Sequence, residues 1–162
     1  MFGRFYAPRF SAQSAKPYVS LLFGARQGVL SSPRFCFFDL GVRHAAAGLP
    51  PEPNVVLANP GPLLEQWVAA ELWKRLGYLG EGHLSYFRTK TGVEVDFIVE
   101  HRGKLIPIEV KWTDRPDASD ARHLRGFLRD HKKVASIGYV VCRCQRPLEL
   151  TPQIHAIPWW ML

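Results

Sequence analysis

Two neighbouring runs of alternating residues constrain this chain most: VEVDFIV from Val93 and KLIPIEVKW from Lys104. Alternation with a period of two is typical of β-strands, because successive side chains point to opposite faces of a sheet. Only residues 101–103 separate the runs, so we expect an antiparallel hairpin. In the first strand we expect a core face and a wet face, which carry, respectively, Val95, Phe97 and Val99, and Glu94, Asp96 and Ile98.

The second strand of this hairpin places an acid and a lysine on one face. Ile106, Ile108 and Val110 form its apolar face, which sends Glu109 and Lys111 to the opposite side. If the register brings Asp96 beside Glu109, two carboxylates converge within reach of one divalent cation. Because Mg²⁺ prefers one or two carboxylates and several waters, this pattern predicts a magnesium site.

Such a site supports hydrolysis of a phosphodiester. A bound Mg²⁺ or Mn²⁺ lowers the pKa of an attacking water and neutralises charge that grows at phosphorus. Lys111 would orient that water or stabilise the charge, and the carbonyl of Val110 would complete the coordination. The alternative is a solvated hairpin face, on which Asp, Glu and Lys lie only because water is there.

The rest of the chain predicts one α/β domain over residues 33–162, preceded by an arm without a sustained period over residues 1–32. We expect a short strand in RFCFFDLG, a short helix over 42–48, a proline-rich loop over 49–61 and a third meander strand in HLSYFR. Two longer helices are predicted over 62–77 and 118–131, and a buried strand in IGYVVCR. Their expected core residues are Leu64, Val68, Leu72 and Leu76 in the first helix, and Leu124, Phe127 and Leu128 in the second.

The net charge of +7 and the pI near 9.6 favour a polyanionic partner such as nucleic acid. We expect phosphate contacts from residues that flank the hairpin or lie on the later helix, although a basic helix is more often a solvated face. The candidates are Arg88, Lys90, Arg122 and Arg125. The five tryptophans could stack on bases, but in a domain of this size such residues are usually core or interface.

The sequence also bears on the compartment. No apolar stretch approaches the ~20 residues needed to cross a bilayer, and the first residues lack the apolar region of a signal peptide. We therefore expect a soluble cytoplasmic protein without membrane contact. Cys36, Cys142 and Cys144 are too few for a zinc site at the usual spacings, so we interpret them as reduced structural thiols.

A helix glutamate, a strand aspartate and Glu-Val-Lys, in this order, resemble the PD-(D/E)XK phosphodiesterase superfamily. That resemblance implies a restriction-endonuclease-like α-β-β-β-α-β core with a mixed central sheet flanked by helices. It also implies catalytic and metal-binding roles for Asp96, Glu109 and Glu65, and a catalytic role for Lys111. More narrowly, GPLLEQWVAAEL, YFRTKTGVEVDFIVE and LIPIEVKW resemble the domain of unknown function 4143, found at the C-terminus of a family of bacterial and archaeal ATPases, from about Pro33 to the end.

These resemblances imply a metal-dependent nuclease with Mg²⁺ or Mn²⁺, acting on nucleic acid, with DNA the expected form. The alternative is a non-catalytic DNA- or protein-binding module that serves an ATPase partner. This chain has no G-x-x-x-x-G-K-[ST] motif, so we do not expect it to hydrolyse ATP. Residues 16–34 resemble only the tail of the upstream winged-helix and ATPase region, and exposed apolar surface would favour a homo-oligomer.

Overall fold

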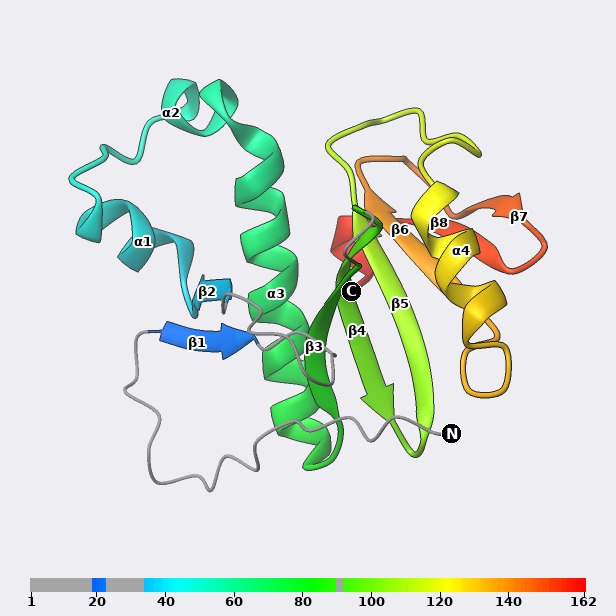
Figure 1. Ribbon diagram of the computed structural model, residues 1–162. Helices are drawn as coiled ribbons and strands as arrows, with labels where there is room; N and C mark the ends of the chain where they lie inside the picture. The colour runs from blue at the N-terminus through cyan, green and yellow to red at the C-terminus, as the bar shows by residue number, and fades with distance from the viewer. Residues whose placement is uncertain (1–18, 23–33, 90–91) are drawn as a thin grey trace.

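A computed structural model describes residues 19–22, 34–89 and 92–162, with side chains from residue 35 onward. It is a mixed α/β structure in which one sheet is flanked by helices (Figure 1). The strands are β1 (Val19–Leu22), β2 (Arg34–Phe37), β3 (His83–Arg88), β4 (Glu94–His101), β5 (Lys104–Val110), β6 (Gly138–Cys142), β7 (Leu148–Thr151) and β8 (Ile154–Pro158). The helices are α1 (Leu40–Ala46), α2 (Pro53–Ala58), α3 (Pro60–Leu79), α4 (Arg122–Asp130) and the 3-10 helix η1 (Trp159–Met161).

The main sheet has six strands in the order β3-β4-β5-β6-β8-β7. The first three strands form the predicted antiparallel meander, whereas β5, β6 and β8 run parallel to one another. β7 closes the far edge antiparallel to β8. The predicted strand IGYVVCR is confirmed as β6, whereas β7 and β8 were not predicted.

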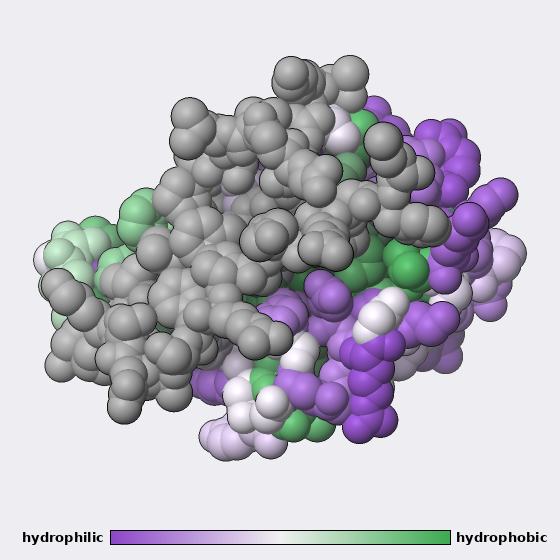
Figure 2. Space-filling model, turned by 60° about the horizontal axis from the view of Figure 1, so that its bottom comes forward, coloured by the Kyte–Doolittle hydropathy of each residue, from purple (hydrophilic) through white to green (hydrophobic). Residues whose placement is uncertain are grey.

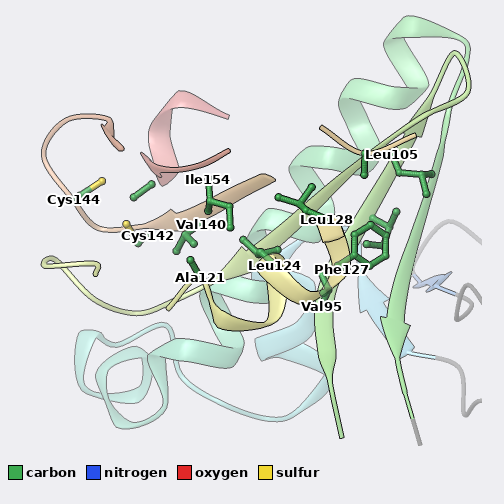
Figure 3. Packing of buried hydrophobic residues seen from close by; sticks show 13 residues of the cluster. Val95, Leu105, Ala121, Leu124, Phe127, Leu128, Val140, Cys142, Cys144 and Ile154 are labelled. Atoms are coloured by element: carbon green, nitrogen blue, oxygen red, sulfur yellow. The ribbon is translucent and has the colours of Figure 1, made fainter. Parts of the chain in front are cut away.

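Each face of the sheet is covered by one helix and holds one apolar core. The α4-side core contains Val95, Ile98, Leu105, Leu124, Phe127, Leu128 and Val140, and Figure 3 shows the α4 side chains lying against those of the strands. The α3-side core contains Leu64, Val68, Leu72, Tyr86, Phe97, Ile108 and Val141. Because helices lie on both faces, neither face of the central strands is a plain water-exposed surface.

This double coverage corrects the predicted division of β4 into a core face and a wet face. Val95 and Ile98 belong to the α4-side core, whereas Phe97 belongs to the α3-side core. The step from Val95 to Ile98 faces the shorter step from Ser85 to Phe87 on β3, so β4 carries one extra residue, a β-bulge. A bulge breaks the alternation of faces, and Asp96 lies within it.

Helix α3 confirms the predicted apolar stripe but not its limits. Leu64, Val68 and Leu72 are buried, whereas Leu76 is only half-buried. The helix starts at Pro60 rather than Pro62 and passes through Gly77. It ends at Gly80, whose φ of 69° is left-handed and whose N–H donates to the carbonyl of Leu76. A glycine at this position relieves the steric cost of that conformation.

Three further boundaries differ from the predictions, each for a local reason. The first helix starts at Leu40 because the Asp39 carboxylate accepts a 3.0 Å hydrogen bond from the Val42 N–H. The predicted loop over 49–61 contains α2, which Pro53 opens at its first turn. Helix α4 starts at Arg122 rather than 118, because Asp117 accepts from the Ser119 N–H at 2.7 Å and holds a turn there.

The segment expected to be an arm contains a described strand. Val19–Leu22 pairs antiparallel with β2, the strand expected in RFCFFDLG, as a separate two-stranded sheet. The rest of the predicted arm, residues 1–18 and 23–32, lies outside the described residues.

The face shown in Figure 2 differs in hydropathy from one side to the other. Hydrophilic residues gather on the side of the molecule that carries α4 and β7, and more hydrophobic residues lie on the side of α1 and α2. No disulfide joins the three cysteines, and Cys142 and Cys144 are buried. Within the described ranges, no helix combines the length and the apolar character that crossing a bilayer requires.

Gly82 connects α3 to β3 at a site with no room for a side chain. Its φ is 105°, and a Cβ there would lie 2.7 Å from Leu76 Cδ2 and 2.8 Å from the carbonyl oxygen of Glu100. We expect Gly82→Ala to lower the free energy of unfolding by about 2 kcal/mol or more, measured by urea denaturation.

Gly103→Ala is the matched control for this substitution. Gly103 also has a positive φ, 73°, but a Cβ would meet no atom within 4 Å among the described residues. Gly103→Ala should lower the free energy of unfolding by only about 1 kcal/mol, from backbone strain alone. Equal losses in the two variants would contradict a steric role for the Gly82 site.

Candidate functional site

The hairpin register brings Asp96 and Glu109 together. Phe97 on β4 and Ile108 on β5 form the last pair of this ladder, and Asp96 and Glu109 are the next residues of the two strands. The charge of Asp96 acts on Glu109, so the two carboxylates lie close together. Asp96 Oδ2 accepts a 2.9 Å hydrogen bond from the N–H of Val110. Asp96 lies within the bulge of β4. The register on which the sequence prediction depended is therefore present.

Glu109 is a carboxylate in an unusual environment. It is only 5% exposed, and its Oε1 accepts a 2.9 Å hydrogen bond from Lys111 Nζ. Its other oxygen, Oε2, is buried and has no hydrogen-bond partner among the described residues. Burial, and next the charge of Asp96, raise the pKa of Glu109 from its ordinary 4.5 to about 7, against the opposing effect of Lys111. Ionisation of Glu109 is therefore unfavourable in the folded protein, and its Oε2 is available to a cation.

Lys111 is held as a cation by its surroundings. Burial lowers its pKa, but the hydrogen bond and charge of Glu109 outweigh this effect, helped by Asp96 and Asp120, so the net pKa is raised. Its side chain keeps 38% exposure, so the ammonium group is open to a ligand. These properties suit stabilisation of negative charge better than proton abstraction.

Two further acids lie near this group. The charge of Glu94 contributes to the raised pKa of Glu109, and that of Asp120 to the raised pKa of Lys111. Glu94 was placed near Asp96 by strand alternation, but nothing in the sequence indicated Asp120. The loop after β5 folds back to bring Asp120 there, and no periodicity describes that return.

Glu65 lies on α3, and the family resemblance implied that it contributes to the metal site. It is half-buried and lines a hollow with Phe97, Pro62 and Gln66 of the main body and with Phe35 and Cys36 of the β2 region. In the described parts of the chain, no three His, Cys, Asp or Glu side chains are grouped as metal ligands. The structure thus joins Asp96, Glu109 and Lys111, and does not gather Glu65 with both acids.

The described candidate phosphate-binding residues lie at the end of β3 and on α4. Arg88 is exposed at the end of β3, and its Nε lies 3.6 Å from the Glu94 carboxylate. Arg122 and Arg125 are exposed on α4, whose His123 Nδ1 lies 2.9 Å from the backbone carbonyl of Glu94. This contact ties α4 to the strand that carries Asp96. Lys90 lies outside the described residues.

Comparison with known proteins identifies the family. The model of the domain of unknown function (DUF4143) matches residues 60–162, from the start of α3 to the end of the chain. The match begins later than the expected Pro33, so β1, β2, α1 and α2 lie before it, while Glu65, Asp96, Glu109 and Lys111 all lie within it. Searches of curated proteins and of solved structures found no match. The chain therefore belongs to the DUF4143 family.

Proposed function

We propose that this domain hydrolyses phosphodiester bonds of nucleic acid with Mg²⁺ or Mn²⁺. The observation that carries the proposal is the buried Oε2 of Glu109, which has no hydrogen-bond partner among the described residues and lies on a carboxylate beside Asp96. A buried, unpartnered carboxylate oxygen is costly unless a cation or proton satisfies it. A perturbed carboxyl with a specific charged partner is also typical of functional sites.

The residues present fit a hard divalent cation. Asp96 and Glu109 would supply carboxylate oxygens and the Val110 carbonyl a third, the oxygen donors that Mg²⁺ and Mn²⁺ prefer. Glu65 is a further candidate ligand by family resemblance. When bound, the cation would lower the pKa of an attacking water and neutralise charge at phosphorus. Lys111 would stabilise the same charge, and Arg88, Lys90, Arg122 and Arg125 would hold neighbouring phosphates.

We assign the domain to the PD-(D/E)XK superfamily on the order of its elements. The order α3-β3-β4-β5-α4-β6 matches the α-β-β-β-α-β core, with Asp96 on β4, Glu109 on β5 and Lys111 directly after β5. The parallel pairing of β5 with β6, beside an antiparallel meander, also supports this assignment. We further propose that the domain acts in the cytoplasm, on DNA, and together with an ATPase partner.

One observation favours a second candidate, a non-catalytic nucleic-acid or ATPase-binding module. Among the described residues no three potential metal ligands are grouped, and Lys111 already neutralises one Glu109 oxygen. Such a module would bind DNA with a steep dependence on salt and release no heat with Mn²⁺. Titration calorimetry with Mn²⁺ separates the two candidates.

Cleavage assays test the leading proposal. The purified full chain would be incubated with linear, branched and single-stranded DNA and with RNA, with and without Mn²⁺. We expect cleavage that requires the metal and is lost in Asp96→Ala. The matched control is Asp130→Ala, because Asp130 is exposed and pairs only at the surface with Arg129, 3.1 Å away. Absence of cleavage on every substrate, or equal cleavage by Asp96→Ala, would rule out hydrolysis at this site.

A further inference from the structure

Aromatic residues follow the strands of the sheet that carries the candidate site, at the end where the parallel strands finish. Trp112 follows Lys111 at the end of β5, Arg143 follows β6, and Trp159 follows β8. The registers Val110 with Val141 and Cys142 with Pro158 bring these three strand ends side by side. Figure 1 shows the end of β5, the start of β4 and the C-terminal segment at the same end of the sheet. Ligands of open sheets with parallel strands bind at this edge.

The side chains of these strand ends form two groups of ring contacts. The Arg143 guanidinium lies 4.3 Å from the centre of the Trp112 ring. Trp159 meets Trp160 edge to face at 5.8 Å and is braced from behind by Trp67 of α3 at 5.0 Å. The backbone supports the arrangement, because Lys111 N–H donates to Val141 and Arg143 N–H donates to Thr113, at 3.0 and 2.8 Å. Trp112, Arg143, Trp159 and Trp160 are named here the tryptophan platform.

The sequence left open whether these tryptophans are core, interface or base-stacking residues, and in the structure three of them are exposed. Trp112, Trp159 and Trp160 are 38%, 37% and 51% exposed, and Met161 beside them is 56% exposed. Large exposed apolar side chains gathered at one place indicate a binding surface. Exposed Arg143 and Arg146, in the loop after β6, add positive charge to a chain of net charge +7.

We propose that the tryptophan platform stacks the unpaired bases of a single-stranded nucleic acid, so that the strand's phosphates pass over Asp96, Glu109 and Lys111. Indole rings and an arginine plane bind base faces, and positive charge binds the backbone, which together describe single-strand recognition. Duplex bases are stacked on each other and cannot offer these faces. The substrate class is then a single strand, or an unpaired end or flap. This inference rests on the proposed function only for the position of the phosphates.

Binding of two labelled oligonucleotides to the full chain tests the platform. One is a single-stranded oligothymidylate, and the other has the same length and charge but abasic sugars, both measured by fluorescence anisotropy in EDTA. We expect the thymidylate to bind more tightly. Trp160→Ala should weaken its binding by about 5- to 100-fold, in line with the loss of one stacked base, and leave binding of the abasic strand unchanged. Trp160→Phe should retain most of the affinity.

Trp73→Ala is the matched control. Trp73 is also an exposed tryptophan, at 42%, but it lies further along α3, in a hollow with Phe38 and Leu84. It should not alter binding of either strand. Equal affinity for the two strands, equal losses with both in Trp160→Ala, or the same loss in Trp73→Ala would overturn the proposal.

The cleavage assay separates this inference from the proposed function. Asp96→Ala should keep base-dependent binding while losing hydrolysis. Base-dependent binding by a chain that cleaves nothing would support the platform and contradict hydrolysis. Cleavage without base-dependent binding would support hydrolysis and overturn the platform.

Discussion

Lys111→Ala should lower the rate of Mn²⁺-dependent cleavage by about 10²- to 10⁴-fold, the range for losing a positioned catalytic group. The lysine is a cation with a raised pKa, bound at 2.9 Å to a buried carboxylate and 38% exposed toward solvent. In our proposal it stabilises charge that develops at phosphorus, which no water placed there would do as well. Single-turnover cleavage at saturating Mn²⁺ measures this loss.

The same substitution should leave metal binding intact. Lys111 Nζ donates to Glu109 Oε1 and competes with a cation for that oxygen. Removing the lysine therefore leaves Oε1 available to the cation and removes no metal ligand. Mn²⁺ should therefore bind Lys111→Ala at least as tightly as the wild-type chain, by calorimetry. This result would distinguish a catalytic lysine from a metal ligand, because Asp96→Ala should lose both Mn²⁺ binding and cleavage.

Lys74→Ala is the control for loss of an ion-paired lysine. Its Nζ lies 2.8 Å from Glu71 on the surface of α3, so its pair has a similar length without the buried acid. Cleavage and metal binding should not change, and surface pairs of this kind contribute only about 0.5 kcal/mol to stability. Wild-type rates in Lys111→Ala would exclude a role for Lys111 in the reaction.

Glu109→Gln should make the metal-free protein more stable at pH 8 while weakening Mn²⁺ binding. The folded protein holds Glu109 with a pKa of about 7, above its ordinary 4.5. Between these values the folded state binds more protons than the unfolded state, so the free energy of unfolding falls as pH rises from about 4.5 to about 7. The total loss is on the order of 3 kcal/mol. Glutamine is neutral at every pH and removes this loss.

Urea denaturation in EDTA at several pH values between 4.5 and 8 measures the effect. The two proteins should have similar stability at the acidic end and diverge as pH rises. Mn²⁺ should stabilise the wild-type chain at pH 8 and have little effect on Glu109→Gln. Glu149→Gln is the control, because Glu149 is exposed on β7 and its change should leave the pH profile as it is. A less stable Glu109→Gln at pH 8 would show that the carboxylate, when charged, stabilises the metal-free fold.

Local patterns predicted most of the framework. Alternation predicted β4 and β5, the strand-like run HLSYFR predicted β3, and the apolar run IGYVVCR predicted β6. The short link over residues 101–103 predicted the antiparallel hairpin that the structure has. Helical spacing identified Val68 in α3 and Phe127 in α4 as core residues, and both are buried. These patterns locate helices and strands because the repeat of apolar residues is a property of the segment itself.

Boundaries were less predictable because they depend on single caps. Gly77 reads as a stop in the sequence, but the chain continues as helix until Gly80, which adopts the left-handed conformation. Asp39 caps the start of α1, and Asp117 holds a turn before α4, through hydrogen bonds that many other aspartates could also make. The sequence does not show which aspartate makes such a hydrogen bond.

The pairing of Asp96 with Glu109 was predictable from the sequence, but their environment was not. Strand alternation and a short turn determined that an aspartate, a glutamate and a lysine would lie on adjacent strands. Only the tertiary structure decided that Asp96 lies in a bulge, that Glu109 is buried, and that Asp120 returns toward Lys111. The parallel packing of β5, β6 and β8 also set three separate strand ends side by side, and so formed the tryptophan platform. Charge, burial and shared edges depend on segments far apart in the chain, and for this reason periodicity within one segment cannot specify them.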